Sequence, residues 1–145
     1  MTTAWTITID CGHPTNLANF WKLALGYVDA PPPVGFDSWR EWLIACDVPE
    51  AEWGDGASLV DPEGVAPSLS LLRVPEGKHA KNRLHIDLQM SGGRTQPTDV
   101  RRSRITAAVE RLIDAGACRL QEHTVAGELD HVVLADPEGN EFCVV

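Results

Sequence analysis

The tetrapeptide Asp-Pro-Glu-Gly occurs twice in the chain, at 61–64 and 136–139. Proline presets φ, aspartate can bond its own backbone and glycine supplies a positive φ, so each copy predicts a tight turn. After the second copy, side chains alternate between two faces: Glu141, Cys143 and Val145 on one, Phe142 and Val144 on the other. This period of two predicts a half-buried strand that follows directly from the turn.

The same order of elements leads to both turns. In the first half, alternation predicts a strand over 5–10, helical spacing predicts a helix over 14–25, and strands are expected over 57–60 and 68–74. In the second half, the corresponding elements are expected at 83–90, 98–115, 117–125, 130–135 and the terminal strand. The chain is therefore predicted to be one α+β domain of two βαβββ modules, about 1–75 and 82–145, that form a pseudo-symmetric curved mixed sheet around a cleft.

The first module contains an insertion at about 29–56. It starts with three consecutive prolines, and Ser38 is expected to cap a short helix. Three of the five tryptophans lie in it: Trp39, Trp42 and Trp53. They are expected either to anchor the inserted helices to the sheet through their large buried area, or to line the cleft and bind a ligand, or to form a dimer contact.

Composition excludes several classes of partner. The formal net charge is −9, from 12 basic and 21 acidic residues. Such a chain repels nucleic acid and anionic membranes, and neither is expected as a partner. The four cysteines have no metal-knuckle spacing, and no stretch has the character of a signal peptide or a membrane span. These features predict a soluble, cytoplasmic protein with free thiols.

The predicted strand faces that point away from the helices carry short polar side chains: Thr6, Thr8, Asp10, Ser68, Ser70, His85, Asp87, Gln89, Glu141 and Cys143. A flat solvated sheet face more often carries lysine and glutamate. Because pockets combine an enclosed surface with a few convergent polar groups, this composition favours a cleft that binds a small molecule.

Several motifs together resemble the vicinal oxygen chelate superfamily, which includes glyoxalases, extradiol dioxygenases, fosfomycin-resistance enzymes and bleomycin-binding proteins. The motifs are Leu25-Gly26 at the end of the first helix, Leu84-His85-Ile86-Asp87-Leu88, Gly116-Ala117 after the second helix, and Asp136-Pro137-Glu138-Gly139-Asn140. The sequence from Lys81 to Leu88, together with Asn140-Glu141-Phe142-Cys143, is similar to sequences of glyoxalase-like domain proteins. The resemblance implies the fold strongly and the reaction weakly, since this fold hosts many chemistries.

The resemblance also implies where a metal would bind. Metal-dependent members place a His or Glu early in each module and a Glu in each module's last strand. His85 matches the first of these positions in the second module, whereas Thr6 stands at its counterpart in the first. Cys143 and Ser68 stand where the two glutamates are expected, and Glu141 lies two residues earlier on the same face as Cys143. The usual metal site is therefore expected to be degenerate.

Three functional interpretations of this cluster remain open, beside a structural one in which His85 is a hydrogen-bonded histidine of the cleft and Cys143 a small buried hydrophobic side chain. His85 with Glu141, Cys143 or Asp10 binds a divalent metal such as Zn²⁺, Ni²⁺ or Fe²⁺. Alternatively, the site has no cofactor and binds a small organic ligand, which His85, Asp87 and Gln89 orient against the three tryptophans and with which Asp10 can pair. In the third interpretation, His85, Glu141 and Cys143 are catalytic without a metal, with His85 as acid/base or as the activator of Cys143.

The resemblance thus implies a glyoxalase-like small-molecule-binding protein. A lyase, isomerase or dioxygenase activity is one expectation, and a protein that sequesters a ligand without catalysis, as in antibiotic resistance, is the other. Because relatives of this architecture often dimerise, a homodimer is expected as its assembly.

Overall fold

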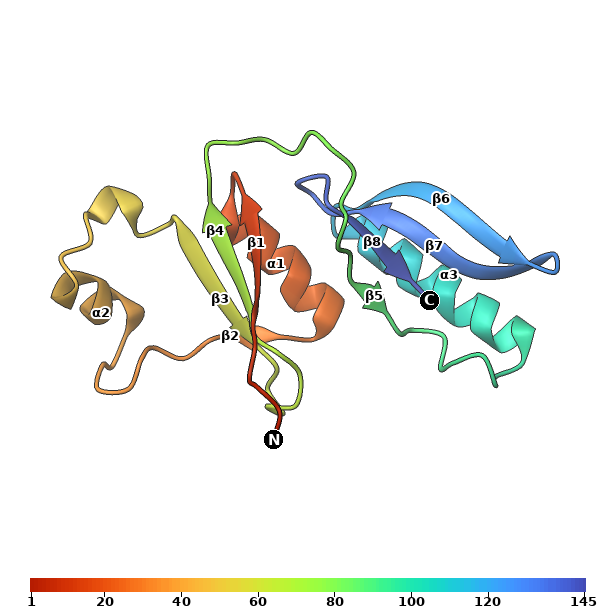
Figure 1. Cartoon of the computed structure of the whole chain (residues 1–145), viewed down its shortest axis with the longest axis horizontal. Coiled ribbons are helices and arrows are strands. Elements are labelled where there is room, and N and C mark those ends of the chain that lie inside the picture. Colours follow the sequence, from red (N-terminus) through yellow and green to blue (C-terminus); the bar gives the residue numbers. More distant parts are fainter. The chain divides into compact units, whose positions relative to one another are not determined.

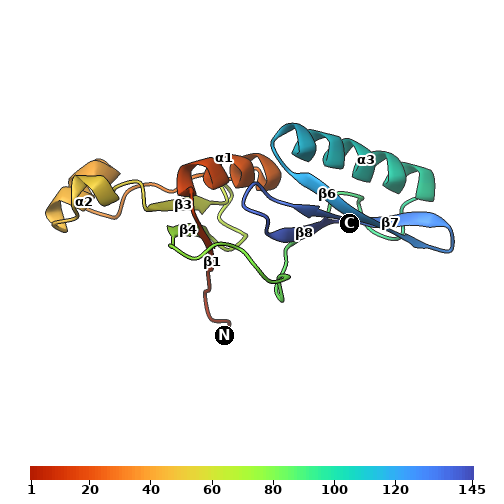
Figure 2. The same cartoon turned by 90° about the horizontal axis from the view of Figure 1, so that it is seen from above.

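The computed structural model describes residues 1–145 and divides into two compact units, Met1–Gly77 and Lys78–Val145. Each unit has a four-stranded mixed sheet with one long helix on one of its faces (Figure 1 and Figure 2). The element order within each unit is strand, helix and three strands. The predicted α+β fold of two βαβββ modules is therefore confirmed.

The sheet of the first unit has the order β1-β4-β3-β2. Its strands are β1 (Ile7–Cys11), β2 (Val28–Asp29), β3 (Gly56–Val60) and β4 (Leu69–Arg73). β1 and β4 are parallel, and the other pairs are antiparallel. β2 lies at the edge of the predicted insertion and was not expected, because two residues are too few to show a period.

Helix α1 (Pro14–Leu25) follows β1 and begins and ends where the sequence predicts. Proline stands in its first turn, and Gly26 ends it in the left-handed conformation with φ +73°, its N–H donating to the Lys22 carbonyl. The segment between β2 and β3 contains a short helix, α2 (Trp39–Ala45), and a 3₁₀ turn, η1 (Glu50–Glu52). Ser38 caps α2 as predicted, since its hydroxyl accepts a hydrogen bond from the Glu41 N–H.

The second unit repeats this topology with the order β5-β8-β7-β6. Its elements are β5 (Asp87–Leu88), α3 (Thr98–Asp114), β6 (Cys118–Val125), β7 (Glu128–Ala135) and β8 (Glu141–Val144). β5 is parallel to β8, as β1 is to β4. The second unit has no equivalent of α2 and η1 between its helix and its turn.

β5 is much shorter than the strand predicted over 83–90. Only Asp87 and Leu88 are in strand conformation, paired with Cys143 and Val144, and Leu84 is 75 % exposed. The N–H of Asn82 donates to the side chain of Glu141 instead of to a strand backbone. The alternation over 83–90 is real, but before Asp87 the backbone bond to β8 is the one from the Cys143 N–H to the Ile86 carbonyl, at 2.9 Å. Residues 83–85 have no such bond, and a strand needs a regular series of them.

The two hydrophobic cores are built in the same way from different side chains. In each unit the apolar stripe of the helix packs on the inner face of the sheet. In the first unit the core side chains are Leu17, Phe20, Trp21, Leu59, Leu69 and Leu71. In the second unit they are Ile105, Val109, Leu112, Val132, Leu134, Phe142 and Val144. Burying one such side chain stabilises a fold by about 1.5–3 kcal/mol.

Both Asp-Pro-Glu-Gly turns form as predicted. The Asp61 carboxylate accepts hydrogen bonds from three backbone N–H groups, and Asp136 accepts two, together with the side-chain amide of Asn140. Gly64 and Gly139 have φ +69° and +87°, which a residue with a side chain adopts rarely. Each turn thus directs the chain into the strand that follows.

No helix in the structure has the length and apolar character that crossing a membrane would require.

Candidate functional site

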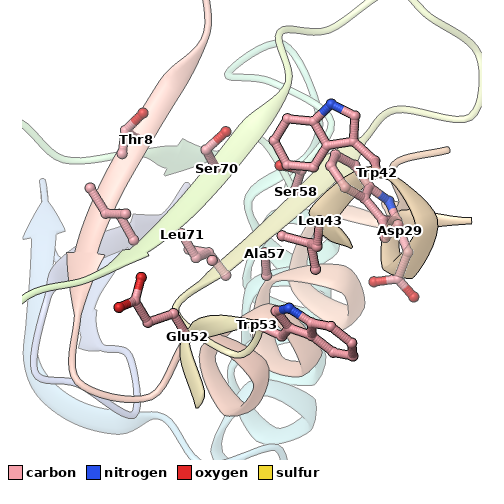
Figure 3. Close-up of a pocket in the computed structure, with 13 residues that line it drawn as sticks. Thr8, Asp29, Trp42, Leu43, Glu52, Trp53, Ala57, Ser58, Ser70 and Leu71 are labelled. Carbon is pink, nitrogen blue, oxygen red and sulfur yellow. The ribbon is translucent and has the colours of Figure 1, made fainter. Parts of the chain in front are cut away.

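A cavity of about 590 Å³ lies in the first unit (Figure 3). One side is the open face of the sheet, and the other is formed by α2, η1 and Trp53. Its lining residues are Thr8, Asp29, Trp39, Trp42, Leu43, Glu52, Trp53, Gly56, Ala57, Ser58, Ser70, Leu71 and Leu72. The helix α1 covers the opposite face of the same sheet.

The sheet side of the cavity carries a row of three hydroxyl groups. Thr8 pairs with Ser70 across β1 and β4, and Ser58 pairs with Ser70 across β3 and β4. The strand period places these side chains away from Leu69 and Leu71, which are buried in the core. The expectation that Thr8 and Ser70 lie on an open polar face agrees with this arrangement.

The three tryptophans of the insertion line the cavity and also fix the inserted segment. The Trp39 ring N–H donates to the Ala30 carbonyl at 2.8 Å, and the Trp53 ring N–H donates to the Val48 carbonyl at 3.0 Å. Trp39 and Trp42 meet edge to face with ring centroids 5.6 Å apart. For Trp39 and Trp53, anchoring the backbone and lining the cavity are therefore two roles of the same side chain.

Sequence reasoning missed three polar lining residues, Asp29, Glu52 and Ser58. Asp29 and Glu52 lie in the insertion, where no period shows which way a side chain points. Ser58 was detectable, because it alternates with the apolar Ala57 and Leu59 in a predicted strand. Asp10, in contrast, is exposed on β1 opposite Leu72 and does not line the cavity.

A second cluster lies in the second unit, where His85, Asp87 and Cys143 bring their ligand atoms within 4.8 Å of one another. Asp87 and Cys143 are directly paired on β5 and β8. His85 Nδ1 is 3.0 Å from the Asp87 carboxylate and 3.9 Å from the Cys143 sulfur. The predicted proximity of His85 and Cys143, 58 residues apart in the chain, is present in the structure.

The environment of Cys143 keeps its thiol protonated. Burial and the nearby Asp87 carboxylate raise the pKa of Cys143 to about 11, because both disfavour the thiolate. At neutral pH the thiolate is the minor form, and the thiolate is the nucleophile. The arrangement therefore argues against Cys143 as a nucleophile activated by His85.

Glu141 is held apart from this cluster. Its carboxylate accepts a hydrogen bond from the Asn82 N–H at 2.9 Å and pairs with the Lys78 ammonium at 3.0 Å. The Asn82 bond and Lys78 stabilise the charged form and lower the pKa of Glu141 to about 2. Asp87, and not Glu141, supplies the carboxylate beside His85. Gln89 is exposed after β5 and is not part of the cluster.

The side chains of His85, Asp87 and Cys143 are of the types that coordinate a divalent metal ion. Imidazole, carboxylate and thiolate all bind Zn²⁺, and a thiolate favours Zn²⁺ over Mg²⁺ or Mn²⁺. Binding would require Cys143 to lose its proton, so the affinity would rise with pH. The cavity and this cluster lie in different units.

The family model for the glyoxalase-like domain matches residues 6–145 of the chain. The protein belongs to the glyoxalase-like domain family. No curated protein matches its sequence.

Three of the solved structures that are similar to this glyoxalase-like protein show what kinds of protein share its fold. One is the fosfomycin resistance protein FosX from Listeria monocytogenes, in a mutant form complexed with Mn(II) and 1S,2S-dihydroxypropylphosphonic acid. It is 11 % identical, with 99 % of this chain and 90 % of that chain covered and a TM-score of 0.61. The second is a possible glyoxalase from Bacillus cereus, 12 % identical over 100 % and 99 % of the two chains, with a TM-score of 0.60.

The third is a glyoxalase/bleomycin resistance protein/dioxygenase family enzyme from Burkholderia phytofirmans, 14 % identical over 96 % and 94 % of the two chains, with a TM-score of 0.57. At such identities the likeness establishes the fold that the sequence resemblance implied. It leaves the reaction and the ligand undetermined, since one fold hosts many functions.

Proposed function

We propose that this glyoxalase-like protein binds a small organic ligand in the cavity of its first unit, and that it acts by sequestration. The observation that carries the proposal is the cavity of about 590 Å³ lined by Trp39, Trp42 and Trp53. Ligand pockets typically measure about 300–1,000 Å³ and combine aromatic walls with a few polar groups. Here the hydroxyl row of Thr8, Ser58 and Ser70 supplies polar groups that can both donate and accept hydrogen bonds.

Sequestration is favoured over metal-free catalysis by the chemistry of the cluster in the second unit. Cys143 is protonated at neutral pH, and the Glu141 carboxylate is bound to Lys78. Neither group is in the state that a nucleophile or a general acid requires. The catalytic roles expected for Cys143 and Glu141 thus have less support than ligand binding by the tryptophans.

A thermal-shift screen of aromatic and antibiotic-like compounds tests this proposal. A ligand that binds only the native state stabilises it by about 2.7 kcal/mol when present at a hundred times its Kd. Trp42→Ala is expected to remove the shift, because it deletes one wall of the cavity. Trp5→Ala is the matched control, since Trp5 is exposed and lies outside the cavity. The proposal is wrong if no compound stabilises the protein, or if Trp42→Ala binds as well as the parent.

A second candidate function is metal-dependent catalysis in the second unit, a lyase, isomerase or dioxygenase reaction. It is favoured by the proximity of His85, Asp87 and Cys143. These three residues would hold a Zn²⁺ ion, which when bound would act as a Lewis acid toward a substrate oxygen. Ni²⁺ and Fe²⁺ are the other ions to be tested.

Zn²⁺ affinity, measured by competition with a chromophoric chelator, tests this candidate. His85→Ala and Cys143→Ser are each expected to weaken binding by about 100-fold, because each removes a direct ligand. Cys118→Ser is the control for thiol content, since Cys118 is exposed on β6. Glu141→Gln is expected to change the affinity little. If Glu141→Gln greatly weakens Zn²⁺ binding and Cys143→Ser does not, the proposed ligand set is wrong. Glu141 would then take the place of Asp87 and Cys143 beside His85.

The homodimer expected from the sequence stays a prediction, which light scattering can test.

A further inference from the structure

The cavity of the first unit carries negative charge and no basic group. Its lining includes the carboxylates of Asp29 and Glu52 and contains no lysine, arginine or histidine. Asp29 pairs with Lys22 at 3.0 Å, which lies outside the cavity. Glu52 makes no ion pair, and the cation beside this wall of the cavity is Arg40, whose guanidinium lies over the Trp53 ring. A ligand that occupies this cavity therefore meets one unpaired carboxylate.

The charge of the whole unit acts in the same direction. Residues 1–77 contain eleven acidic and three basic side chains, a formal charge of −8, whereas residues 78–145 contain ten and nine, a charge of −1. Almost all of the excess negative charge thus belongs to the unit that contains the cavity. Such a field raises the local concentration of cations and lowers that of anions.

The aromatic walls also suit a cation. The face of an indole ring carries the negative part of its quadrupole and attracts a positive charge within about 6 Å. Trp53 already makes such a contact, since the guanidinium carbon of Arg40 lies 5.5 Å from its ring centroid. Trp39 and Trp42 line the same cavity and meet each other edge to face, and no cation–π contact occupies their rings.

We propose that the ligand of this cavity is an organic cation, a planar aromatic molecule that carries a quaternary or protonated nitrogen. This inference rests on the proposed binding function and specifies its ligand class. The rings stack on the tryptophans, and the positive nitrogen is stabilised by Glu52. An anionic ligand of the same shape would place its charge against an unpaired carboxylate, so the cavity selects against it.

Calorimetric titration with three probes of the same bicyclic ring tests the inference. The probes are N-methylquinolinium, a permanent cation; quinoline, which is neutral at neutral pH; and quinoline-2-carboxylate, an anion. The cation is expected to bind roughly tenfold more tightly than quinoline, from the usual size of cation–π and carboxylate contacts. The anion is expected to bind most weakly, and added salt is expected to reduce the preference for the cation.

Variants that change the charge at position 52 test whether Glu52 causes the preference for the cationic probe. Glu52→Gln keeps the side-chain shape and is expected to reduce the preference for the cation by roughly threefold without changing the affinity for quinoline. Glu52→Lys is expected to abolish the preference. Glu50→Gln is the matched control, because Glu50 is exposed in the same 3₁₀ turn and does not line the cavity. Melting temperatures of all three variants report whether the fold is retained.

The outcomes separate this inference from the function on which it rests. If quinoline or the carboxylate binds as tightly as the cation, and Trp42→Ala abolishes that binding, the cavity binds ligands but the proposed charge class is wrong. If the preference for the cation is unchanged in Glu52→Gln and Glu52→Lys, the assignment to Glu52 is wrong. If no probe binds the parent protein, the inference is overturned, and the wider screen then decides on the function.

Discussion

The two units arrange the same elements in the same order, with β1-β4-β3-β2 in one and β5-β8-β7-β6 in the other. They differ in what is attached to that scaffold. The first unit adds α2 and η1 between its helix and its turn, and this addition forms a cavity against the open sheet face. The second unit lacks the addition and presents His85, Asp87 and Cys143 on the corresponding strand pair. The two units therefore share the core between helix and sheet and differ in the residues on the sheet face opposite the helix.

The two units also differ in net charge, because they differ in the number of basic side chains available to pair with acidic ones. In the second unit, arginines of α3 and of the segment before it pair with acidic residues of β7: Arg94 and Arg101 with Asp130, and Arg102 with Glu128. The first unit has only three basic side chains to balance eleven acidic ones. Its negative charge is thus left to solvent and, in the proposed function, to a ligand.

The largest expected effect tests whether the two cores are equivalent. Leu17 in α1 and Leu112 in α3 are both 0 % exposed. Leu17→Ala and Leu112→Ala should each lower the free energy of unfolding by about 2–5 kcal/mol, the usual cost of such a deletion. All five tryptophans lie in the first unit, so fluorescence in a denaturant titration reports that unit and circular dichroism reports both.

Leu23→Ala is the control for this pair, because Leu23 is on α1 but 41 % exposed, and it should cost less than about 1 kcal/mol. Unequal losses for the two buried leucines would show that the repeated topology conceals different packing.

The next effect concerns thiol reactivity, for which each unit supplies one buried and one exposed cysteine. Cys11 and Cys143 are buried, and Cys46 and Cys118 are exposed. At neutral pH, Cys143 should react with iodoacetamide roughly 100-fold more slowly than Cys118, because its pKa is raised to about 11. Site-resolved mass spectrometry of a time course measures the rates. Fast labelling of Cys143 would restore it as a candidate nucleophile.

The smallest effect is a pH dependence specific to the second unit. The pKa of Glu141 is lowered from 4.5 to about 2, so its stabilising contribution is complete above about pH 4.5 and is lost as pH falls toward 2. Glu141→Gln should reduce stability by about 1–2 kcal/mol near neutral pH, and the difference from the parent should vanish toward pH 2.

Denaturation at a series of pH values measures this difference. Glu110→Gln, on the exposed side of α3, serves as the control for the removal of a carboxylate from an exposed position. A stability difference for Glu141→Gln that does not change between pH 4.5 and 2 would contradict the assignment to Lys78 and Asn82.

Local patterns in the sequence were sufficient for the fold and for most of the elements, with β2 and the length of β5 as the exceptions. The turns at Asp61 and Asp136, the end of α1 at Gly26 and the cap at Ser38 all depend on a few adjacent residues. For that reason they could be predicted without knowing any distant partner. The repetition of these signals then gave the two βαβββ modules.

The candidate site was predictable in part. The sequence named the three tryptophans and the pair of His85 and Cys143, because residue type and strand period mark them. It placed Glu141 beside His85, but the structure gives that position to Asp87, and it did not identify Asp29 or Glu52 in the cavity.

The sequence by itself thus determined most of the elements, their order and the polar face of each sheet, including the terminal strand that carries Cys143. Only the tertiary structure decided which polar groups meet. The pairing of Asp87 with Cys143 depends on the register of two strands that are far apart in the chain, and a shift by one residue would turn each side chain to the other face. Similarly, the ring N–H groups of Trp39 and Trp53 bind backbone carbonyls within the inserted segment that lines the cavity, and local patterns do not specify such contacts.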